Sequence, residues 1–492
     1  MPSQSLLSKS VRWDLVLFWL YLLLLVVLFG TSLNVVDPDL WHRLVVADYL
    51  FHTGHFAPGN ALGYLGIPEV KPDIEWGSAL VLYVTYILGG GTSLVLLKLV
   101  TLGTSLVIVV RAGLGSRPPS MLDAFFYCLV LLSLLPSFLS TIRSEASTHI
   151  LFALWILWFQ QERRGHRVSA WAYVLTMALW VNLHGGFILG IAWLGATAVI
   201  TFFTGGDWLR QLRLLVLSLL ATLANPFGYK LWGSIYEELS VPRPGFDEWE
   251  PVPWLHDMGH FASYKLLALW GVAVVCVHIY RVGWGKCDRA AVILLGLALI
   301  PSLAHVRHTS IFALVAGGLV PPLFLPEKSL HEIHEWKLWL HRFVVRAILI
   351  ALPLVYAWRL MPANEGLHLV YPPDTCPVGA VDYLKRTDTT GNLLVGYNSG
   401  SYASWELRGQ MRVSLSGRYV AIFTYATFQK VQRFFAAEDH WRDALAGPVP
   451  DAILVNRPDP VYPKMLVEPG WTEVYRDATH AVFRPATKET SP

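Results

Sequence analysis

Long apolar runs separated by short polar segments fill the first 361 residues of the chain. A helix that crosses a bilayer needs about 20 mostly apolar residues, because its backbone polar groups must bond within the helix in hydrocarbon. We therefore expect a polytopic all-α membrane domain over residues 1–361 with about 11 membrane-spanning helices. The runs lie at residues 13–33, 76–110, 121–141, 146–159, 171–182, 187–203, 214–224, 264–284, 290–304, 309–325 and 343–361.

Two of these runs permit a second interpretation. The first follows Lys9 and Arg12, as in a secretory signal, but no small-residue cleavage site follows it, so we expect a retained anchor. The run at 76–110 contains Gly89-Gly90-Gly91, which could divide it into two crossings. We interpret it as one broken crossing and expect Lys98, within it, to face protein or water.

Lysine and arginine collect in alternate connecting segments. With the N-terminus in the cytoplasm, the internal segments hold 16 Lys+Arg, and the opposite segments before residue 362 hold eight. Cytoplasmic loops carry the excess of positive charge in membrane proteins. This bias predicts a cytoplasmic N-terminus and places residues 362–492 on the external face.

The pattern changes after residue 361. Residues 362–492 contain 13 Lys+Arg and 14 Asp+Glu but only three of the 21 tryptophans, which predicts a water-facing domain. Short apolar runs at 392–397, 411–415, 452–456, 471–475 and 481–483 predict strands, and 378–386 and 426–445 predict helices. We expect a small external α/β domain, in which Gly396-Tyr-Asn-Ser-Gly400 is a turn that could bind a ligand.

Composition narrows the function classes. The chain is 54% hydrophobic and 15% charged, whereas soluble domains are about 25% charged. A net charge of only +3 argues against a nucleic-acid partner, and four cysteines without CxxC spacing indicate neither a disulfide framework nor a zinc site. P-loop, GxGxxG, HExxH and GxSxG motifs are absent, which weakens nucleotide-driven transport and the common hydrolases.

The first external segment, residues 37–75, carries the most informative polar residues. Asp37-Pro-Asp39 precedes an apolar pattern typical of an amphipathic helix on the bilayer, on which Asp39 and His42 share a face. One carboxylate could act as a general base, or the two could hold a divalent cation. Alternatively, Asp37 or Asp39 simply caps the helix.

Further polar residues fall on the same predicted external face. They are Arg143 beside Glu145, His184 before Gly185-Gly186, and the cluster of His305, Arg307 and His308. Each has a structural alternative: an Arg143–Glu145 ion pair, a histidine satisfied within close helix packing, and an interfacial cluster. The internal residues His331 and His334 have possible metal-ligand spacing, but a surface helix over 329–342 accounts for them better.

The motifs resemble those of a known fold class. Asp37-Pro-Asp39, then 53–58 (Thr-Gly-His-Phe-Ala-Pro), then 71–76 (Lys-Pro-Asp-Ile-Glu-Trp) resemble the first loop of the GT-C integral-membrane glycosyltransferases. That class includes the protein mannosyltransferases and the lipid A aminoarabinose transferases. The chain looks still more like an uncharacterised bacterial multispanning group with an Asp-x-Asp-Leu-Trp-x-His start. Further motifs of that group correspond to residues 180–187, 225–228, 401–405 and Gly417-Arg418.

The resemblance implies transfer of a sugar from a polyprenyl-phosphate donor to a glycan, lipid or protein acceptor at the external face of a bacterial inner membrane. It implies Asp39 or Asp37 as the catalytic base, with no certain cofactor and a divalent cation as an option. Arg307 is our first choice for the donor phosphate and Arg143 the second. His305 and His308 lie beside that site, and His42, His184 and Glu75 are candidates to orient the substrates.

Two competing functions are considered. The acidic motif is Asp-Pro-Asp rather than the Asp-Glu pair of the mannosyltransferases, which permits a non-catalytic scaffold or assembly subunit that binds a protein through its external tail. A transporter is disfavoured because no internal repeat is visible.

Overall fold

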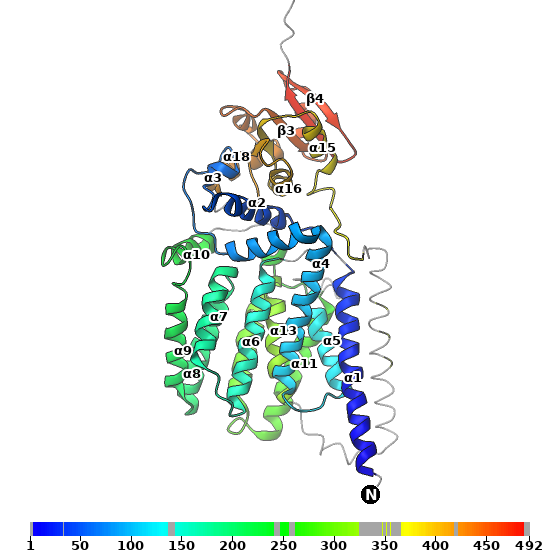
Figure 1. Cartoon of the computed structure of the whole chain (residues 1–492), viewed down its shortest axis with the longest axis vertical. Helices are drawn as coiled ribbons and strands as arrows, with labels where there is room; N and C mark the ends of the chain where they lie inside the picture. Colours follow the sequence, from blue (N-terminus) through cyan, green and yellow to red (C-terminus); the bar gives the residue numbers. More distant parts are fainter. Residues whose placement is uncertain are drawn as a thin grey trace, which may run out of the picture. The chain divides into compact units, whose positions relative to one another are not determined.

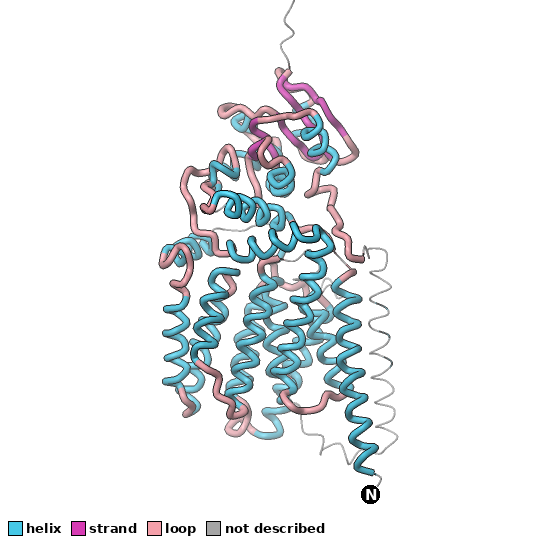
Figure 2. The backbone as a smooth tube through the Cα atoms, in the orientation of Figure 1, coloured by secondary structure: helices cyan, strands magenta, loops and turns pink. Residues whose placement is uncertain are grey.

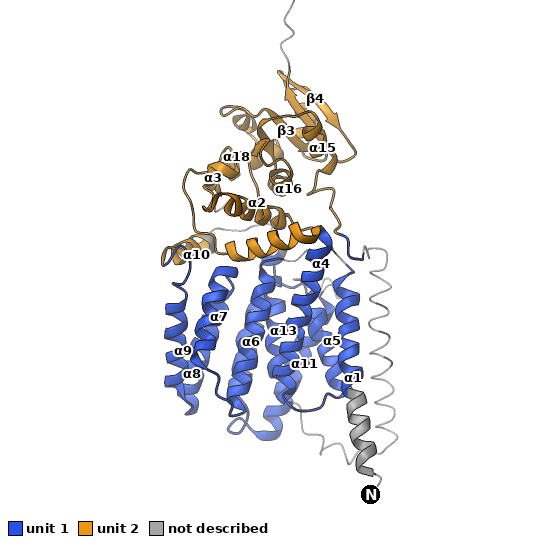
Figure 3. Cartoon of the chain, in the orientation of Figure 1, with its two compact units in different colours: residues 1–34, 91–228, 241–368 blue, residues 35–90, 229–240, 369–492 orange. Residues whose placement is uncertain are grey.

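The computed structural model describes residues 3–32, 34–135, 143–240, 247–254, 261–323, 366–417 and 422–486, together with residues 347, 351 and 355. The chain forms two compact units (Figure 3). Unit 1 comprises residues 1–34, 91–228 and 241–368, and unit 2 comprises 35–90, 229–240 and 369–492. The expected boundary at residue 361 therefore stays a prediction, because unit 2 also takes in the first external segment. The predicted helices at 329–342 and 343–361 lie outside the described residues, apart from 347, 351 and 355.

Unit 1 is built of helices in its described residues (Figures 1 and 2). They follow the predicted apolar runs closely, with ends that extend a few residues into the flanking polar segments. They are α1 (Ser3–Gly30), the second part of α4 (Trp76–Leu114), α5 (Met121–Leu134), α6 (Glu145–Arg163), α7 (Ala170–Leu183), α8 (Phe187–Thr204), α9 (Trp208–Ala221), the 3-10 turn η2 (Asp247–Trp249), α11 (Ala262–Val282), α12 (Arg289–Ala304), η3 (Val306–His308), α13 (Thr309–Leu319) and η4 (Pro321–Leu323).

Four helical segments among the described residues are long and apolar enough to cross a membrane. Shorter apolar helices at Leu15–Gly30, Leu122–Leu134, Ala170–Leu183 and Arg289–Ala304 accompany them. Large apolar side chains stay exposed along these helices, for example Leu88, Leu175 and Ile300. Lipid around these helices, rather than water, accounts for the exposure of so many apolar side chains. The number of 11 crossings stays a prediction. The four long segments are Trp76–Leu114, Phe187–Thr204, Ala262–Val282 and Val306–Leu323.

Helix α4 is broken at the glycine triplet. Gly89 and Gly90 are non-helical, and Gly90 has φ 59° and ψ −144°, a conformation that side-chain-bearing residues avoid. The part before the break is about 20 Å long, too short for a hydrocarbon core of about 30 Å, whereas residues 91–114 span about 36 Å. In the first part, the Tyr83 hydroxyl donates to Asp48 Oδ1 at 2.8 Å, which ties this part to the first external segment. These lengths favour one crossing.

Lys98 has a polar partner within unit 1. Its ammonium donates to Asn34 Oδ1 at 3.0 Å, and the Asn34 amide donates to the Gly366 carbonyl at 2.7 Å. Lys98 is 1% exposed, so the sequence expectation that it faces protein is confirmed. Asn34 could not be identified as the partner from the sequence, because the two residues are 64 positions apart.

Unit 2 contains a five-stranded sheet in the order β2-β1-β3-β5-β4. Strands β2, β1 and β3 are parallel, and β5 is antiparallel to β3 and β4. All five strands match the runs predicted from the sequence, which confirms the small α/β domain. The strands are β1 (Gly391–Val395), β2 (Met411–Val413), β3 (Ala452–Asn456), β4 (Trp471–Arg476) and β5 (His480–Pro485). The helices of unit 2 besides the first part of α4 are α2 (Pro38–Thr53), α3 (Gly59–Leu62), α10 (Lys230–Ser240), α15 (Val378–Arg386), α16 (Tyr397–Glu406), α18 (Tyr425–Ala436), the 3-10 turn η7 (Trp441–Leu445) and α19 (Val461–Met465).

Two local predictions in this domain were wrong. The glycine-rich segment 396–400 is the start of α16 and not a turn, because Gly396 supplies the extended N-cap and the following residues continue as a helix. The predicted helix 426–445 is two elements: α18 ends at Ala436, its C-cap Ala437 has φ 54°, and η7 begins at Trp441. The amphipathic helix expected after Asp39 is confirmed as α2, but its apolar residues pack within unit 2, where Trp41 stacks on Tyr371.

The first external segment also covers the open edge of the sheet. Gly63 forms a parallel bridge with Val413 of the edge strand β2, and the Tyr64 amide donates to the Val413 carbonyl at 3.1 Å. Further along, the Ile67 amide donates to the Ile422 carbonyl at 2.9 Å. A β-carbon on Gly63 would lie 2.6 Å from the Phe423 ring, so only glycine permits this approach. The segment and the C-terminal domain therefore form one packed body.

Candidate functional site

Asp37 acts as the N-cap of α2. Its backbone is extended, with φ −81° and ψ 134°, and its Oδ1 accepts the backbone N–H of Asp39 at 2.9 Å. Pro38 occupies the first helical position, where a missing N–H costs nothing. The capping alternative is thus correct for Asp37, which is 7% exposed. Its carboxylate holds the first turn of the helix that carries Asp39.

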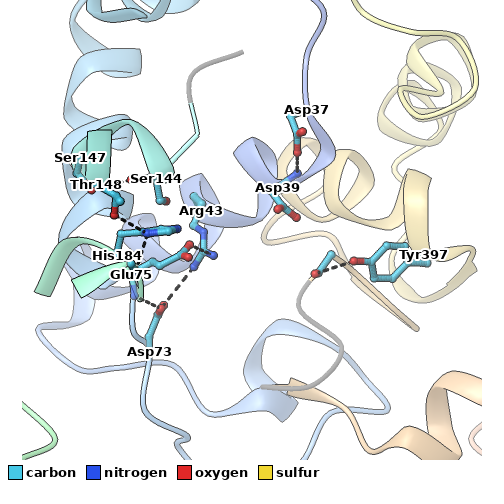
Figure 4. A network of polar contacts seen from close by, with 12 residues as sticks. Asp37, Asp39, Arg43, Asp73, Glu75, Ser144, Ser147, Thr148, His184 and Tyr397 are labelled. Carbon is cyan, nitrogen blue, oxygen red and sulfur yellow. Dashed lines mark hydrogen bonds and ion pairs between the residues drawn. The ribbon is translucent and has the colours of Figure 1, made fainter. Parts of the chain in front are cut away.

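Asp39 lies against a loop of the C-terminal domain. A β-carbon on Gly417 would be 3.0 Å from Asp39 Oδ1 and 3.0 Å from Ser401 Oγ. Gly417 is itself fixed, because its N–H donates to Ser401 Oγ at 2.8 Å and its carbonyl accepts the Tyr397 hydroxyl at 3.0 Å (Figure 4). Asp39 is half-buried. The loop after β2 therefore leaves room for this carboxylate only because residue 417 is glycine.

His42 faces the same loop. Its Nδ1 lies 3.3 Å from Ser416 Oγ, and both residues are 2% exposed. The prediction that Asp39 and His42 share a face of the helix is confirmed, since one meets Gly417 and the other Ser416. His42 is thereby a positioning group between α2 and the loop.

Glu75 belongs to a buried ion-pair cluster. Arg43 pairs with Glu75, and its Nη1 lies 3.4 Å from Asp73 Oδ1. The same Asp73 oxygen accepts the Glu75 backbone N–H at 2.9 Å (Figure 4). Asp73 is 4% exposed, so this cluster joins α2 firmly to the segment before α4.

An aromatic cluster underlies α2. Trp41 is fully buried and packs edge-on against Tyr402 as well as stacking on Tyr371. Cys376 lies at this cluster, and burial, with smaller opposing hydrogen bonds from Thr375 and Trp41, raises the pKa of its thiol to about 11. A thiol with that pKa is protonated at neutral pH and is a poor nucleophile. The cluster is therefore structural.

Within unit 1, Arg143 and Arg307 share one carboxylate. Arg143 Nη1 lies 2.8 Å from Glu248 Oε2, and Arg307 Nη1 lies 3.9 Å from Glu248 Oε1. Arg143 pairs with Glu248 of η2, 105 residues away, and Glu145 also interacts electrostatically with Arg143 and Arg307, so the expected Arg143–Glu145 attraction is one of two. Glu145 Oε1 also lies 3.8 Å from His149 Nε2. The two arginines chosen for phosphate are thus brought to one place.

The segment of His305 to His308 is organised by Trp249. The Arg307 guanidinium lies 4.4 Å above the Trp249 ring, and His305 Nδ1 is 2.6 Å from the Trp249 carbonyl. The rings of His305 and His308 meet edge-on, 5.8 Å apart. Trp249 therefore orients Arg307 and His305 together.

His184 is held in one tautomer. The Gly186 backbone N–H donates to His184 Nδ1 at 2.9 Å, and the Thr148 hydroxyl lies 2.8 Å from the same nitrogen (Figure 4). Thr148 in turn accepts the Trp180 indole N–H at 2.9 Å. Nδ1 is thus the unprotonated nitrogen, and the proton of the neutral ring lies on Nε2. A satisfied histidine beside close-packed glycine was one of the two interpretations made from the sequence.

Among the residues described, no group of three or more His, Cys, Asp or Glu side chains is arranged to hold a metal ion. The paired histidines at 331 and 334 lie outside those residues.

Sequence reasoning missed Glu248, Trp249, Arg43, Ser401 and Ser416 as parts of these clusters. Glu248 and Trp249 lie in a loop without periodicity, and Ser416 is 374 residues from His42. One local signal could have identified Arg43. It follows Asp39 by one helical turn of α2, and its positive charge on that face needs a carboxylate partner.

No family model matches the chain, and no curated protein matches its sequence. Its structure is similar to the crystal structure of ArnT from Cupriavidus metallidurans bound to undecaprenyl phosphate, with a TM-score of 0.50 and 15% sequence identity. The match covers 97% of this chain and 99% of the ArnT chain. ArnT is a GT-C lipid A aminoarabinose transferase, so the GT-C-type fold implied by the sequence resemblance is confirmed.

Proposed function

We propose that this protein is a membrane glycosyltransferase that transfers a sugar from a polyprenyl-phosphate donor to an acceptor at the external face of a bacterial inner membrane. The observation that supports this most is the shared fold with ArnT, whose crystal structure holds undecaprenyl phosphate. The chain adds an acidic first turn of α2 and a pair of arginines around one carboxylate. Each of these features has a defined task in such a transfer.

Asp39 is the proposed general base. Its carboxylate takes the proton of an acceptor hydroxyl, whose oxygen forms a bond to the anomeric carbon of the donor sugar. The bond from that carbon to the phosphate oxygen breaks, and its electron pair leaves with the polyprenyl phosphate. Asp39 is favoured over Asp37 because Asp37 caps α2 and is 7% exposed, whereas Asp39 is only half-buried.

Arg307 and Arg143 are the proposed ligands of the donor phosphate. A guanidinium presents paired N–H donors that match phosphate oxygens, and stacking on Trp249 holds Arg307 in a fixed plane. His305 and His308 lie on either side of it in sequence and are proposed to complete the anion site.

The remaining candidates are proposed to orient the substrates. His184, with its proton on Nε2, is suited to donate to a sugar or phosphate oxygen. His42 and Glu75 act from α2 and its ion-pair cluster, through their contacts with Ser416 and Arg43.

Native mass spectrometry of the detergent-purified full chain, supplied with undecaprenyl phosphate, tests the donor site. The wild-type chain is expected to retain one lipid phosphate, and Arg307→Gln to lose it. Arg163→Gln is the matched control, because Arg163 pairs with Asp288 in the same unit and has no place in the proposed site. A wild-type chain that takes up no lipid phosphate but carries a stoichiometric protein partner would instead support the scaffold.

A further inference from the structure

Glu248 gives the arginine pair an internal counter-charge. Its two carboxylate oxygens face different arginines, with Oε2 2.8 Å from Arg143 Nη1 and Oε1 3.9 Å from Arg307 Nη1. The second distance is beyond hydrogen-bond range, so this attraction is purely electrostatic. Glu145 of α6 also interacts electrostatically with Arg143, Arg307 and Glu248, so two arginines and two carboxylates make up this charged cluster.

The position of Glu248 relative to Arg307 is fixed by the backbone. The Trp249 carbonyl lies 2.6 Å from His305 Nδ1, and the Val306 backbone N–H donates to the Glu250 carbonyl at 3.0 Å. Residues 249 and 250 are thereby joined to residues 305 and 306, just before Arg307, and the Trp249 ring lies under its guanidinium. Glu248 therefore cannot move far from an anion bound to these arginines.

We infer, on the basis of the function proposed above, that Glu248 sets the charge preference of the phosphate site, favouring the singly charged phosphodiester of the donor over the doubly charged phosphomonoester of the product. A diester carries one negative charge, so Glu248 repels it less. A monoester carries between 1.5 and 2 negative charges at neutral pH. The extra charge is repelled by Glu248, so the product binds less tightly and leaves.

Two probes that share a lipid tail isolate this effect. Farnesyl phosphate is a monoester and its monomethyl ester is a phosphodiester, and both are titrated at pH 7.5 into the detergent-purified full chain. Glu248→Gln is expected to tighten monoester binding roughly tenfold and diester binding about threefold or less, since the removed repulsion scales with ligand charge.

Two further variants separate charge from local structure. Glu250 is exposed and lies two residues after Glu248. Glu250→Gln removes a charge of the same sign and should leave the ratio of the two affinities unchanged. Glu248→Asp keeps the charge and should keep the wild-type ratio. If Glu248→Gln changes both affinities equally or not at all, or if Glu250→Gln changes the ratio as much, the inference is wrong while the donor site stands. If neither probe binds to any of these chains, the proposed donor site is wrong as well.

Discussion

The carboxylate of Asp37 accepts the backbone N–H of Asp39 at 2.9 Å, so the two acids of the first external segment have different tasks. One holds the first turn of α2, and the other stands on that turn against the loop of Gly417. A short acidic motif thus supplies both a helix cap and a carboxylate suited to chemistry.

The capping role of Asp37 predicts a contrast between two substitutions. Asparagine caps helices as well as aspartate does, whereas alanine cannot, and loss of a cap costs about 1 kcal/mol. Asp37→Asn should therefore leave hydrogen exchange in the first turn of α2 unchanged, and Asp37→Ala should accelerate it. Equal exchange rates in the two variants would show that the cap contributes little.

The close approach of Gly417 predicts a loss of turnover without loss of the fold. In Gly417→Ala the new methyl group lies 3.0 Å from Asp39 Oδ1 and must displace either that carboxylate or Ser401. The displaced group must move by a few tenths of an ångström, and because a misplacement of about 1 Å can cost roughly a hundredfold, turnover should fall severalfold. Sugar transfer and thermal unfolding are measured on the same preparation.

Gly396→Ala is the control for that experiment. The atoms nearest to its β-carbon belong to Phe435 at 3.7 Å, which is an ordinary contact, and its φ of −69° suits alanine. If both alanine variants are equally active, Gly417 does not set the position of Asp39.

The buried ring of His480 makes the stability of the C-terminal domain depend on pH. It is 1% exposed, and its burial, only partly opposed by Asp477 and Asp374, lowers the pKa of its ring below 6.5. The unfolded chain therefore binds a proton that the folded chain rejects as pH falls below about 6.5, so acid destabilises the domain. Hydrogen exchange in β5 of the full chain, corrected for the intrinsic rate, should show less protection at pH 5 than at pH 7.

The variant His480→Gln checks the origin of that effect, because glutamine does not titrate. Its protection should be independent of pH between 5 and 7, a window chosen above the range in which Asp477 titrates, since the pKa of that carboxyl is lowered. Burial acts against this lowering, and hydrogen bonds from His480, Thr479 and Tyr475 outweigh it. A variant that still loses protection at pH 5 would assign the effect to other groups.

The close approach of Gly63 to Phe423 predicts that a larger side chain here loosens the packing of the first external segment on the sheet. In Gly63→Val the side chain would enter the Phe423 ring, and overpacking of this kind costs about 1–3 kcal/mol. Limited proteolysis should then cut the segment between Gly54 and Ile67 faster. Gly195→Ala, in α8 with open space around it, should leave the cleavage rate unchanged.

The sequence predicted the elements better than their contacts. Apolar runs located the helices of unit 1 and the five strands, because length and hydrophobic alternation are local properties. The prediction of a turn at 396–400 was wrong, because glycines are typical both of turns and of the start of a helix. The links of Lys98 to Asn34, Arg143 to Glu248 and His42 to Ser416 join residues far apart in the chain, and no local pattern encodes such pairs.

The most direct test of the central proposal is turnover by matched variants of the first acidic motif. Proteoliposomes made with a lipid extract containing polyprenyl-phosphate sugars are incubated with wild-type chain, Asp37→Asn or Asp39→Asn, and the released polyprenyl phosphate is measured by mass spectrometry. We expect release by the wild-type chain and by Asp37→Asn, with a loss of at least a hundredfold in a folded Asp39→Asn. Equal release by Asp39→Asn, or none by the wild-type chain, would contradict catalysis by this carboxylate.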